Sequence, residues 1–197
     1  RDFGIKGIWM SVFHSISAFC NAGFDILGTT DHTFVSLTGY SRNIWLNIVI
    51  MLLIILGGIG FLTWEDFYTN KFKFKRYRMQ SKVILITTAI LIIAPAVFFF
   101  ACDFGNLPAG KRLLASVFQS VTTRTAGFNT EDLSLMTEAG KAVMILLMLI
   151  GGSPSSTAGG MKTTTFAVLI LNALATFRSR EDAGAFGRRF DGQVIKN

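Results

Sequence analysis

Residues Phe118 to Thr130 read FQSVTTRTAGFNT, and a near-copy, FHSISAFCNAGFD, precedes them from Phe13 to Asp25. When the two are aligned from the right, Ala22-Gly23-Phe24 falls on Ala126-Gly127-Phe128, and the copies differ by one residue in length. Each copy has an apolar run with hydroxyl side chains that predicts a short helix, followed by a small residue, Gly-Phe, and Asn or Asp. A single Ala-Gly-Phe would carry no information, but its repetition predicts a duplicated structural unit.

The chemistry that needs this pattern is the dehydration of an ion. A selectivity filter replaces the water shell of the ion with rings of backbone carbonyl oxygens, and glycine adopts the unusual backbone angles that this requires at no steric cost. A short helix that ends just before the loop points its partially negative carboxyl end at the pore, which favours a cation. The alternative is that each copy is an ordinary helix ending in a glycine cap.

The composition indicates an integral membrane protein. The chain of 197 residues is 51% hydrophobic and only 16% charged, whereas soluble domains are about 25% charged. Its net charge of +7 would also suit a nucleic-acid partner, but basic loops on the cytoplasmic side of a membrane explain it better. We therefore expect an all-α membrane fold, no nucleic-acid partner, and the lipid bilayer as its surroundings.

Two charge-free stretches, from Ile44 to Trp64 and from Val83 to Cys102, reach the length of about 20 residues that crosses a bilayer. Trp45 and Trp64 would mark the two interfaces of the first span. This span also carries three glycines that would let a neighbouring helix or a pore loop pack closely: Gly57, Gly58 and Gly60.

Two shorter segments, Ile8 to Cys20 and Lys111 to Arg124, are predicted pore helices because each leads into a Gly-Phe copy. A last span is interrupted: residues 142–150 and 163–177 are apolar, but residues 151–162 between them read GGSPSSTAGGMK. Pro154 and four glycines oppose a regular helix there.

The chain is therefore divided into four parts. Residues 1–64 hold the pore helix, filter loop and inner span of one repeat, residues 65–82 a basic cytoplasmic loop, residues 83–177 a complete repeat, and residues 178–197 a basic cytoplasmic tail. The first repeat lacks a leading span, so we expect a fragment of a longer polypeptide. A carbonyl ring takes about four loops, and this chain supplies two.

The two copies, together with IGGSPSSTAGGMKTTTF from Ile150 onward, resemble the KtrB-type potassium-transporting subunits of the Trk/Ktr/HKT superfamily. The resemblance implies span–pore loop–span repeats of the potassium-channel type, pseudo-fourfold in the full protein, and potassium uptake across the bacterial cytoplasmic membrane by a multi-pass protein. K⁺ would be the transported ion, with no organic cofactor. The implied partners are the other repeats of the same polypeptide, a second copy of the subunit, and a cytosolic nucleotide-binding regulatory ring of the KtrA type.

The resemblance also assigns residues. Those that would bind potassium in the filter are Asn21, Ala22, Gly23, Phe24, Thr125, Ala126, Gly127 and Phe128. Those that would form an intramembrane gate beneath it are Gly151, Gly152, Ser153, Pro154, Ser155, Ser156, Thr157, Ala158, Gly159, Gly160 and Lys162. Lys162 would either repel potassium from the pore or extend to the cytoplasmic interface.

Three polar residues near the loops have predicted roles of their own. Arg124 should point behind the filter, towards a carboxylate or carbonyl groups, because a cation in the ion path would oppose transport. His14 and Gln119 occupy matching positions of the two pore helices, which favours hydrogen bonds to neighbouring segments over proton chemistry.

Three other functions compete with a pore. One of them, a purely structural membrane subunit, leaves the interruption of the last span unexplained. A secondary transporter of a small solute also uses a broken helix at the membrane midplane, but this leaves the duplicated Gly-Phe loops unexplained. An enzyme is not expected: GGMKTTT resembles a phosphate-binding loop, yet Met161 separates Gly160 from Lys162 and a membrane span precedes it.

Overall fold

The computed structural model describes residues 4–29, 33, 35–71, 73–178, 184–185 and 188–189. Within them the helices are joined by loops, and there are two strands of two residues each. Its elements in order are α1 (Gly4–Phe19), η1 (Thr38–Tyr40), α2 (Ile44–Ile59), α3 (Phe61–Asn70), η2 (Phe74–Arg76), α4 (Met79–Cys102), α5 (Ala109–Thr122), η3 (Leu133–Leu135), α6 (Glu138–Leu149), α7 (Thr163–Phe177), β1 (Gly184–Ala185) and β2 (Arg188–Arg189).

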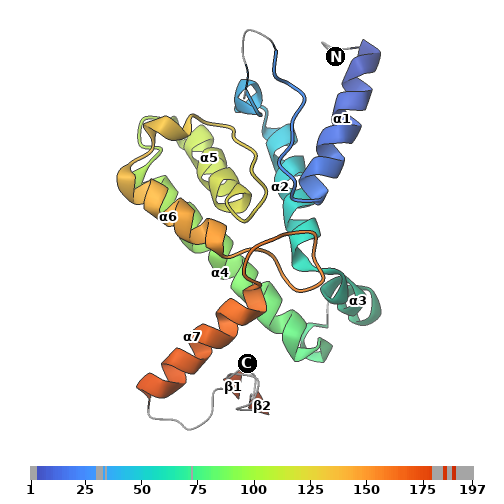
Figure 1. Ribbon diagram of the computed structural model, residues 1–197, viewed down its shortest axis with the longest axis vertical. Coiled ribbons are helices and arrows are strands. Elements are labelled where there is room, and N and C mark those ends of the chain that lie inside the picture. Colours follow the sequence, from blue (N-terminus) through green and yellow to red (C-terminus); the bar gives the residue numbers. More distant parts are fainter. Residues whose placement is uncertain are drawn as a thin grey trace.

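The helices form the expected arrangement of a short helix, a loop and a longer helix, twice. Helices α1 and α5 lead into the two Gly-Phe loops and lie on either side of α2 (Figure 1), against which both of them pack. Helix α4 packs along α5 and also contacts α6 and α7. The predicted all-α class with span–loop–span repeats is thus confirmed, with the addition of the β1–β2 pair near the C-terminus.

One buried cluster joins the two repeats. It combines residues of α1, α2 and α5 with the second Gly-Phe loop, and both Phe118 and Phe128 are 0% exposed in it. The buried members are Ala18, Leu37, Ile50, Met51, Ile54, Phe118, Val121, Ala126 and Phe128. The cluster therefore fixes the position of one loop relative to the other.

Among the residues that the structure describes, α4 is the one continuous helix that is long and apolar enough to cross a membrane, with 24 residues. Helices α2 and α3 reach that length only together, and they are bent by 95° at the break between them. Helix α7 is apolar but shorter.

The prediction of one straight span from Ile44 to Trp64 is wrong. Helix α2 ends at Ile59, and Gly60 has a φ of 92°, which L residues rarely adopt. The next residue, Phe61, donates its backbone N–H to the carbonyl of Ser155 at 2.9 Å. Trp64 lies in α3 and marks no end of a straight span, and the domain boundary expected at residue 64 falls inside this helix.

Other boundaries differ less. Helix α1 begins at Gly4 instead of Ile8, and α4 at Met79 instead of Val83. Helix α5 covers Ala109–Thr122, two residues before the expected start and end. The difference at α4 arises because the prediction admitted only charge-free residues to this span, whereas Lys82 lies in the first turn of the helix.

Candidate functional site

The fold brings the two predicted filter loops together. Gly23 and Gly127 have φ angles of 72° and 83°. A Cβ atom added to Gly23 would overlap the carbonyl oxygen of Ala126 and stand 3.1 Å from Cα of Gly127. Neither glycine therefore tolerates a side chain without strain, and the two loops meet at these residues.

The backbone alternates in the same way in both loops. Asn21 and Thr125, two residues before the glycines, have φ angles of 51° and 67°, whereas Ala22 and Ala126 between them are not in this region. A left-handed conformation costs a non-glycine residue about 1–3 kcal/mol, so its recurrence at matched positions is not incidental. Alternating hands make successive N–H groups converge on one side of the chain and direct the carbonyl oxygens to the other.

A matched hydroxyl group supports each loop. The Ser17 hydroxyl donates to the carbonyl of Phe24 at 2.8 Å, and the Thr122 hydroxyl donates to the carbonyl of Phe128 at 2.6 Å. Both hydroxyls lie at the C-terminal end of their pore helix and hold the residue after the glycine. Sequence reasoning missed these two residues, although the hydroxyl-bearing runs before both loops were the signal for them.

The surroundings of the two loops are not equal. Phe128 is 0% exposed inside the cluster that joins the repeats, whereas its counterpart Phe24 is 70% exposed. The second loop is also tied to the segment before η1: the N–H of Leu37 donates to the carbonyl of Asn129 at 2.9 Å, and the N–H of Asn129 donates to the hydroxyl of Ser36 at 3.0 Å.

The predicted gate residues, 151–160 and 162, form a folded loop between α6 and α7. The N–H of Gly151 donates to the carbonyl of Met161 at 2.9 Å, and the N–H of Met161 donates to that of Leu149 at 3.1 Å. A Cβ atom on Gly151 would overlap the carbonyl oxygen of Gly159. The glycines therefore allow the two sides of the loop to lie in direct contact.

The same loop binds the break between α2 and α3. The N–H groups of Ser153 and Thr157 donate to the carbonyls of Gly58 and Gly57 at 3.0 and 3.3 Å. The last carbonyls of a helix have no partner within that helix, so the gate loop satisfies two of them. The close approach expected at the glycines of the first span is confirmed: Gly60 approaches the gate loop, and Gly57 approaches both the gate loop and the carbonyl of Phe19 at the end of α1.

Thr157 also joins the gate loop to the first filter loop. Its hydroxyl donates to the carbonyl of Phe19 at 2.8 Å and accepts a hydrogen bond from the side-chain Nδ2 of Asn21 at 3.0 Å. Phe19 is the last residue of α1, and Asn21 is the first of the predicted filter residues. One side chain of the gate loop thus contacts both the pore helix and the start of its filter loop.

The two cations near the site have different surroundings. Lys162 is partly buried and donates from Nζ to the carbonyl of Ala158 at 2.9 Å, inside the gate loop itself. Arg124 is buried, and within the described residues it makes no salt bridge and its Nε has no hydrogen-bond partner. Among the described residues Nε of Arg124 therefore lacks the expected carboxylate or carbonyl partner, and a partner for the rest of its guanidinium stays a prediction.

The paired polar residues of the pore helices both make hydrogen bonds to neighbouring segments, as predicted. Gln119 donates to Sδ of Met144 on α6 at 3.3 Å. His14 lies with Nδ1 2.6 Å from the carbonyl of Met10 in its own helix, and the N–H of Ile26, after the first loop, donates to Nε2 at 3.5 Å. This pair of partners fits a neutral imidazole that carries its proton on Nδ1.

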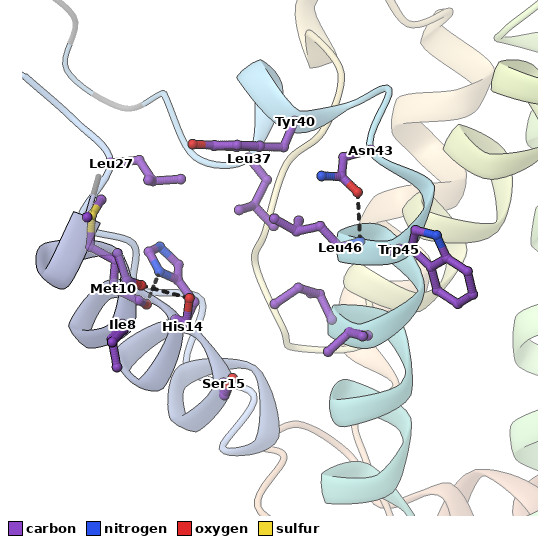
Figure 2. A pocket seen from close by; sticks show the side chains of 15 residues that line it. Ile8, Met10, His14, Ser15, Leu27, Leu37, Tyr40, Asn43, Trp45 and Leu46 are labelled. Carbon is purple, nitrogen blue, oxygen red and sulfur yellow. Dashed lines mark hydrogen bonds between the residues drawn. The ribbon is translucent and has the colours of Figure 1, made fainter. Parts of the chain in front are cut away.

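His14 also lines a cavity of about 660 Å³ between α1 and α2. Figure 2 shows it with Leu27, Leu37, Tyr40 and Leu46 around the ring of His14 and the gap between the helices. None of the eight predicted filter residues lines it. The cavity is therefore separate from the place where the two loops meet.

Comparison with known proteins places this geometry in a family. The family described as TrkH, cation transport protein, matches residues 1–197. The chain is 42% identical over 193 residues to the potassium/sodium uptake protein NtpJ of Enterococcus hirae, and 36% identical over 196 residues to the Ktr system potassium uptake protein B of Bacillus subtilis.

These alignments cover 95% and 96% of the chain but only 41% and 42% of the two relatives. The chain therefore spans about two fifths of their length. Its fold is similar to the crystal structure of the potassium transporter TrkH from Vibrio parahaemolyticus, with a TM-score of 0.73 at 17% identity, over 95% of this chain and 40% of that one. Because the family match extends over every residue, the chain belongs to the TrkH family of cation transport proteins.

Proposed function

We propose that this chain forms two filter loops and the gate of a pore that takes up potassium. The observation that carries the proposal is the shared backbone of the two loops, with left-handed residues at 21 and 23 and again at 125 and 127. Such alternation presents consecutive carbonyl oxygens on one side of each loop, and these are the ligands that replace the water shell of K⁺.

The family supports this function over the alternatives. It is a family of cation transport proteins and not of enzymes, and its members lie in the membrane. Two relatives are named for the uptake of potassium, one of them together with sodium. We infer that K⁺ is the transported ion, bound by backbone carbonyls of residues 21–23 and 125–127. Phe24 and Phe128, also predicted as filter residues, have carbonyls that already accept hydrogen bonds from Ser17 and Thr122.

The gate is the second part of the proposal. Residues 151–160 and 162 lie between two helical segments, against the ends of α1 and α2. A loop at this depth is tolerated in a membrane where it is buried in protein or borders water. We propose that it blocks the pathway while the hydrogen bonds of Thr157, Ser153 and Ser155 hold it in place.

The remaining assignments concern the complete protein. We propose that it acts in the bacterial cytoplasmic membrane as a pair of subunits, each with further repeats around the same pore. A cytosolic nucleotide-binding ring would regulate it. The name of the Bacillus subtilis relative, a protein of a Ktr system, is the support for a multi-component transporter.

The experiment compares rubidium uptake by the full-length protein in potassium-uptake-deficient bacteria for wild type, Gly127→Ser and a control, Gly105→Ser. Gly127 has a left-handed φ, where a side chain costs about 1–2 kcal/mol, whereas a Cβ on Gly105 meets nothing within 4 Å. We expect Gly127→Ser to need much more external potassium or to admit sodium, and Gly105→Ser to behave as wild type.

Equal uptake by an expressed Gly127→Ser variant would show that this glycine does not line the pathway. Absence of rubidium uptake by the wild type, with its cytosolic partner supplied, would favour a secondary transporter of another solute.

A further inference from the structure

Helix α3 carries an aromatic face that is exposed. Phe61, Trp64 and Tyr68 follow one another at the three- and four-residue spacing of a single helix face, with exposed fractions of 57%, 36% and 87%. Phe67 lies beside them and is 42% exposed. Tryptophan and tyrosine combine an apolar ring with a polar group, and they are enriched where a membrane meets water.

The opposite face of α3 is attached to the start of the membrane-spanning helix α4. Asp66 is 3% exposed. Its Oδ2 accepts hydrogen bonds from the hydroxyl of Ser81 at 2.6 Å and from the N–H of Arg78 at 3.0 Å. Helix α4 begins at Met79. These bonds therefore hold α3 at the same depth in the membrane as the first turn of α4.

The direction of α3 is consistent with a position at the membrane surface. Helix α3 is bent by 95° from α2, and Figure 1 shows it at the lower end of α2, beside the beginning of α4. A helix that leaves a spanning segment at a right angle at the depth where another span begins runs along the membrane surface. Interfacial helices of this kind bury their apolar face at the boundary of headgroups and acyl chains.

Four exposed cations follow the aromatic face directly: Lys71, Lys73, Lys75 and Arg76. None of them forms a salt bridge with a carboxylate in the described part of the chain. The two acidic residues of α3 are instead bound by Arg78, with Glu65 at 3.0 Å and Asp66 at 3.6 Å. Arg78 thus offsets one of the two negative charges of α3, and the cations at positions 71, 73, 75 and 76 remain without a carboxylate partner among the described residues.

We propose that α3, together with Lys71, Lys73, Lys75 and Arg76, forms a binding surface for anionic phospholipid headgroups. The aromatic face of α3 enters the interface, and the four cations contact the phosphate groups of lipids such as phosphatidylglycerol. Four to eight Lys or Arg residues next to a span or on an amphipathic helix are the usual pattern for such lipids. This surface does not depend on the ion that the protein transports, so it stands independently of the proposed function.

The test measures lipid binding to the purified full-length protein by native mass spectrometry, with phosphatidylglycerol and phosphatidylcholine as probes. The variant is Lys75→Gln/Arg76→Gln. The matched control is Lys6→Gln/Arg42→Gln, which removes one exposed Lys from α1 and one exposed Arg from the turn before α2. The unfolding midpoint in lipid-free detergent checks that all three proteins are folded.

We expect wild type to prefer phosphatidylglycerol, and this preference to weaken as salt is added. One cation near an anionic surface is worth about fivefold in affinity, so the double variant should bind phosphatidylglycerol about 25-fold more weakly. The control should equal wild type. Inorganic phosphate should not compete, because it has no acyl chain to place against the aromatic face.

Three results would overturn the proposal. They are equal binding of the two lipids by wild type, unchanged phosphatidylglycerol binding in the Lys75→Gln/Arg76→Gln variant, and equal losses in variant and control. If the variant keeps its lipids but loses binding to a cytosolic regulatory protein, the surface belongs to that protein and not to the membrane.

Discussion

Replacing Thr157 by Val should open the gate. Valine keeps nearly the shape of threonine but removes the hydroxyl that donates to the carbonyl of Phe19 at 2.8 Å and accepts from Asn21 at 3.0 Å. Asn21 is 8% exposed, so water replaces the lost partner poorly. Leaving buried polar groups without partners costs about 1–3 kcal/mol. The change destabilises only the position of the gate loop seen in this structure, because the Thr157 hydroxyl makes its two hydrogen bonds there.

A free-energy change of this size shifts a two-state equilibrium by about 5- to 150-fold. If the loop blocks the pathway in this position, the unblocked population must rise by that factor, up to saturation. The assay is rubidium uptake by the full-length protein in potassium-uptake-deficient cells, with no cytosolic regulator present, where wild-type uptake should be low. We expect Thr157→Val to raise this unregulated uptake severalfold or more.

The control is Thr165→Val, the same chemical change at an exposed position near the start of α7. It should leave the uptake unchanged. If Thr157→Val is expressed at wild-type levels and its unregulated uptake is unchanged or lower, the hydroxyl does not hold the gate closed, and the argument from its two hydrogen bonds fails.

Three further variants test separate parts of the structure. Thr122→Val removes the hydroxyl that holds the carbonyl of Phe128, so the potassium concentration for half-maximal uptake should rise about two- to tenfold for a loss of about 0.5–1.5 kcal/mol. Thr87→Val on α4 serves as its control. A similar rise in the potassium concentration for half-maximal uptake in both variants would contradict a local role of the Thr122 hydroxyl. Gly60→Ala places a Cβ at a φ of 92° against the carbonyl of Pro154 and should lower stability by at least about 1–2 kcal/mol. In the control, Gly39→Ala, the added Cβ meets nothing within 4 Å, and stability should not change. Equal unfolding midpoints of the two variants in detergent would show that the bend does not require glycine at position 60. Asp66→Ala should lower stability by about 1–3 kcal/mol, because it leaves Ser81 and Arg78 without their buried acceptor. Loss of the exposed ion pair between Glu65 and Arg78 should cost no more than about 1 kcal/mol. Equal losses of stability on removing the Asp66 and Glu65 carboxylates, in a thermal denaturation assay, would argue against the attachment of α3 to α4 through Asp66.

The repeated Gly-Phe motif was sufficient to predict where the loops lie, because glycine at a left-handed position is a local requirement. Gly23 and Gly127 have that conformation in the structure, and the helices before them are present. The interruption of the last span was predictable for the same kind of reason, since Pro154 and the surrounding glycines weaken a helix wherever they occur.

The bend at Gly60 could not be predicted in this way. Residues 44–64 are charge-free throughout, and hydropathy carries no information about direction. The helix ends because the carbonyls of Gly57 and Gly58 and the N–H of Phe61 find partners in a loop about a hundred residues later in the chain. The same holds for Arg124, whose burial without a partner for its Nε depends on how the described segments surround it.

The sequence by itself determined the local features of this protein: its membrane class, its duplicated loops, its broken last span and its family. These features depend on composition and on residue types at short spacing along the chain, so no knowledge of distant contacts is needed to recognise them. Only the tertiary structure decided that Thr157 joins the gate loop to the first filter loop, and that α3 turns aside at the level where α4 begins. Those contacts join segments far apart in the chain, and their hydrogen-bonding groups, mostly backbone N–H and carbonyl groups, are present in nearly every residue. No residue pattern marks which of them will meet.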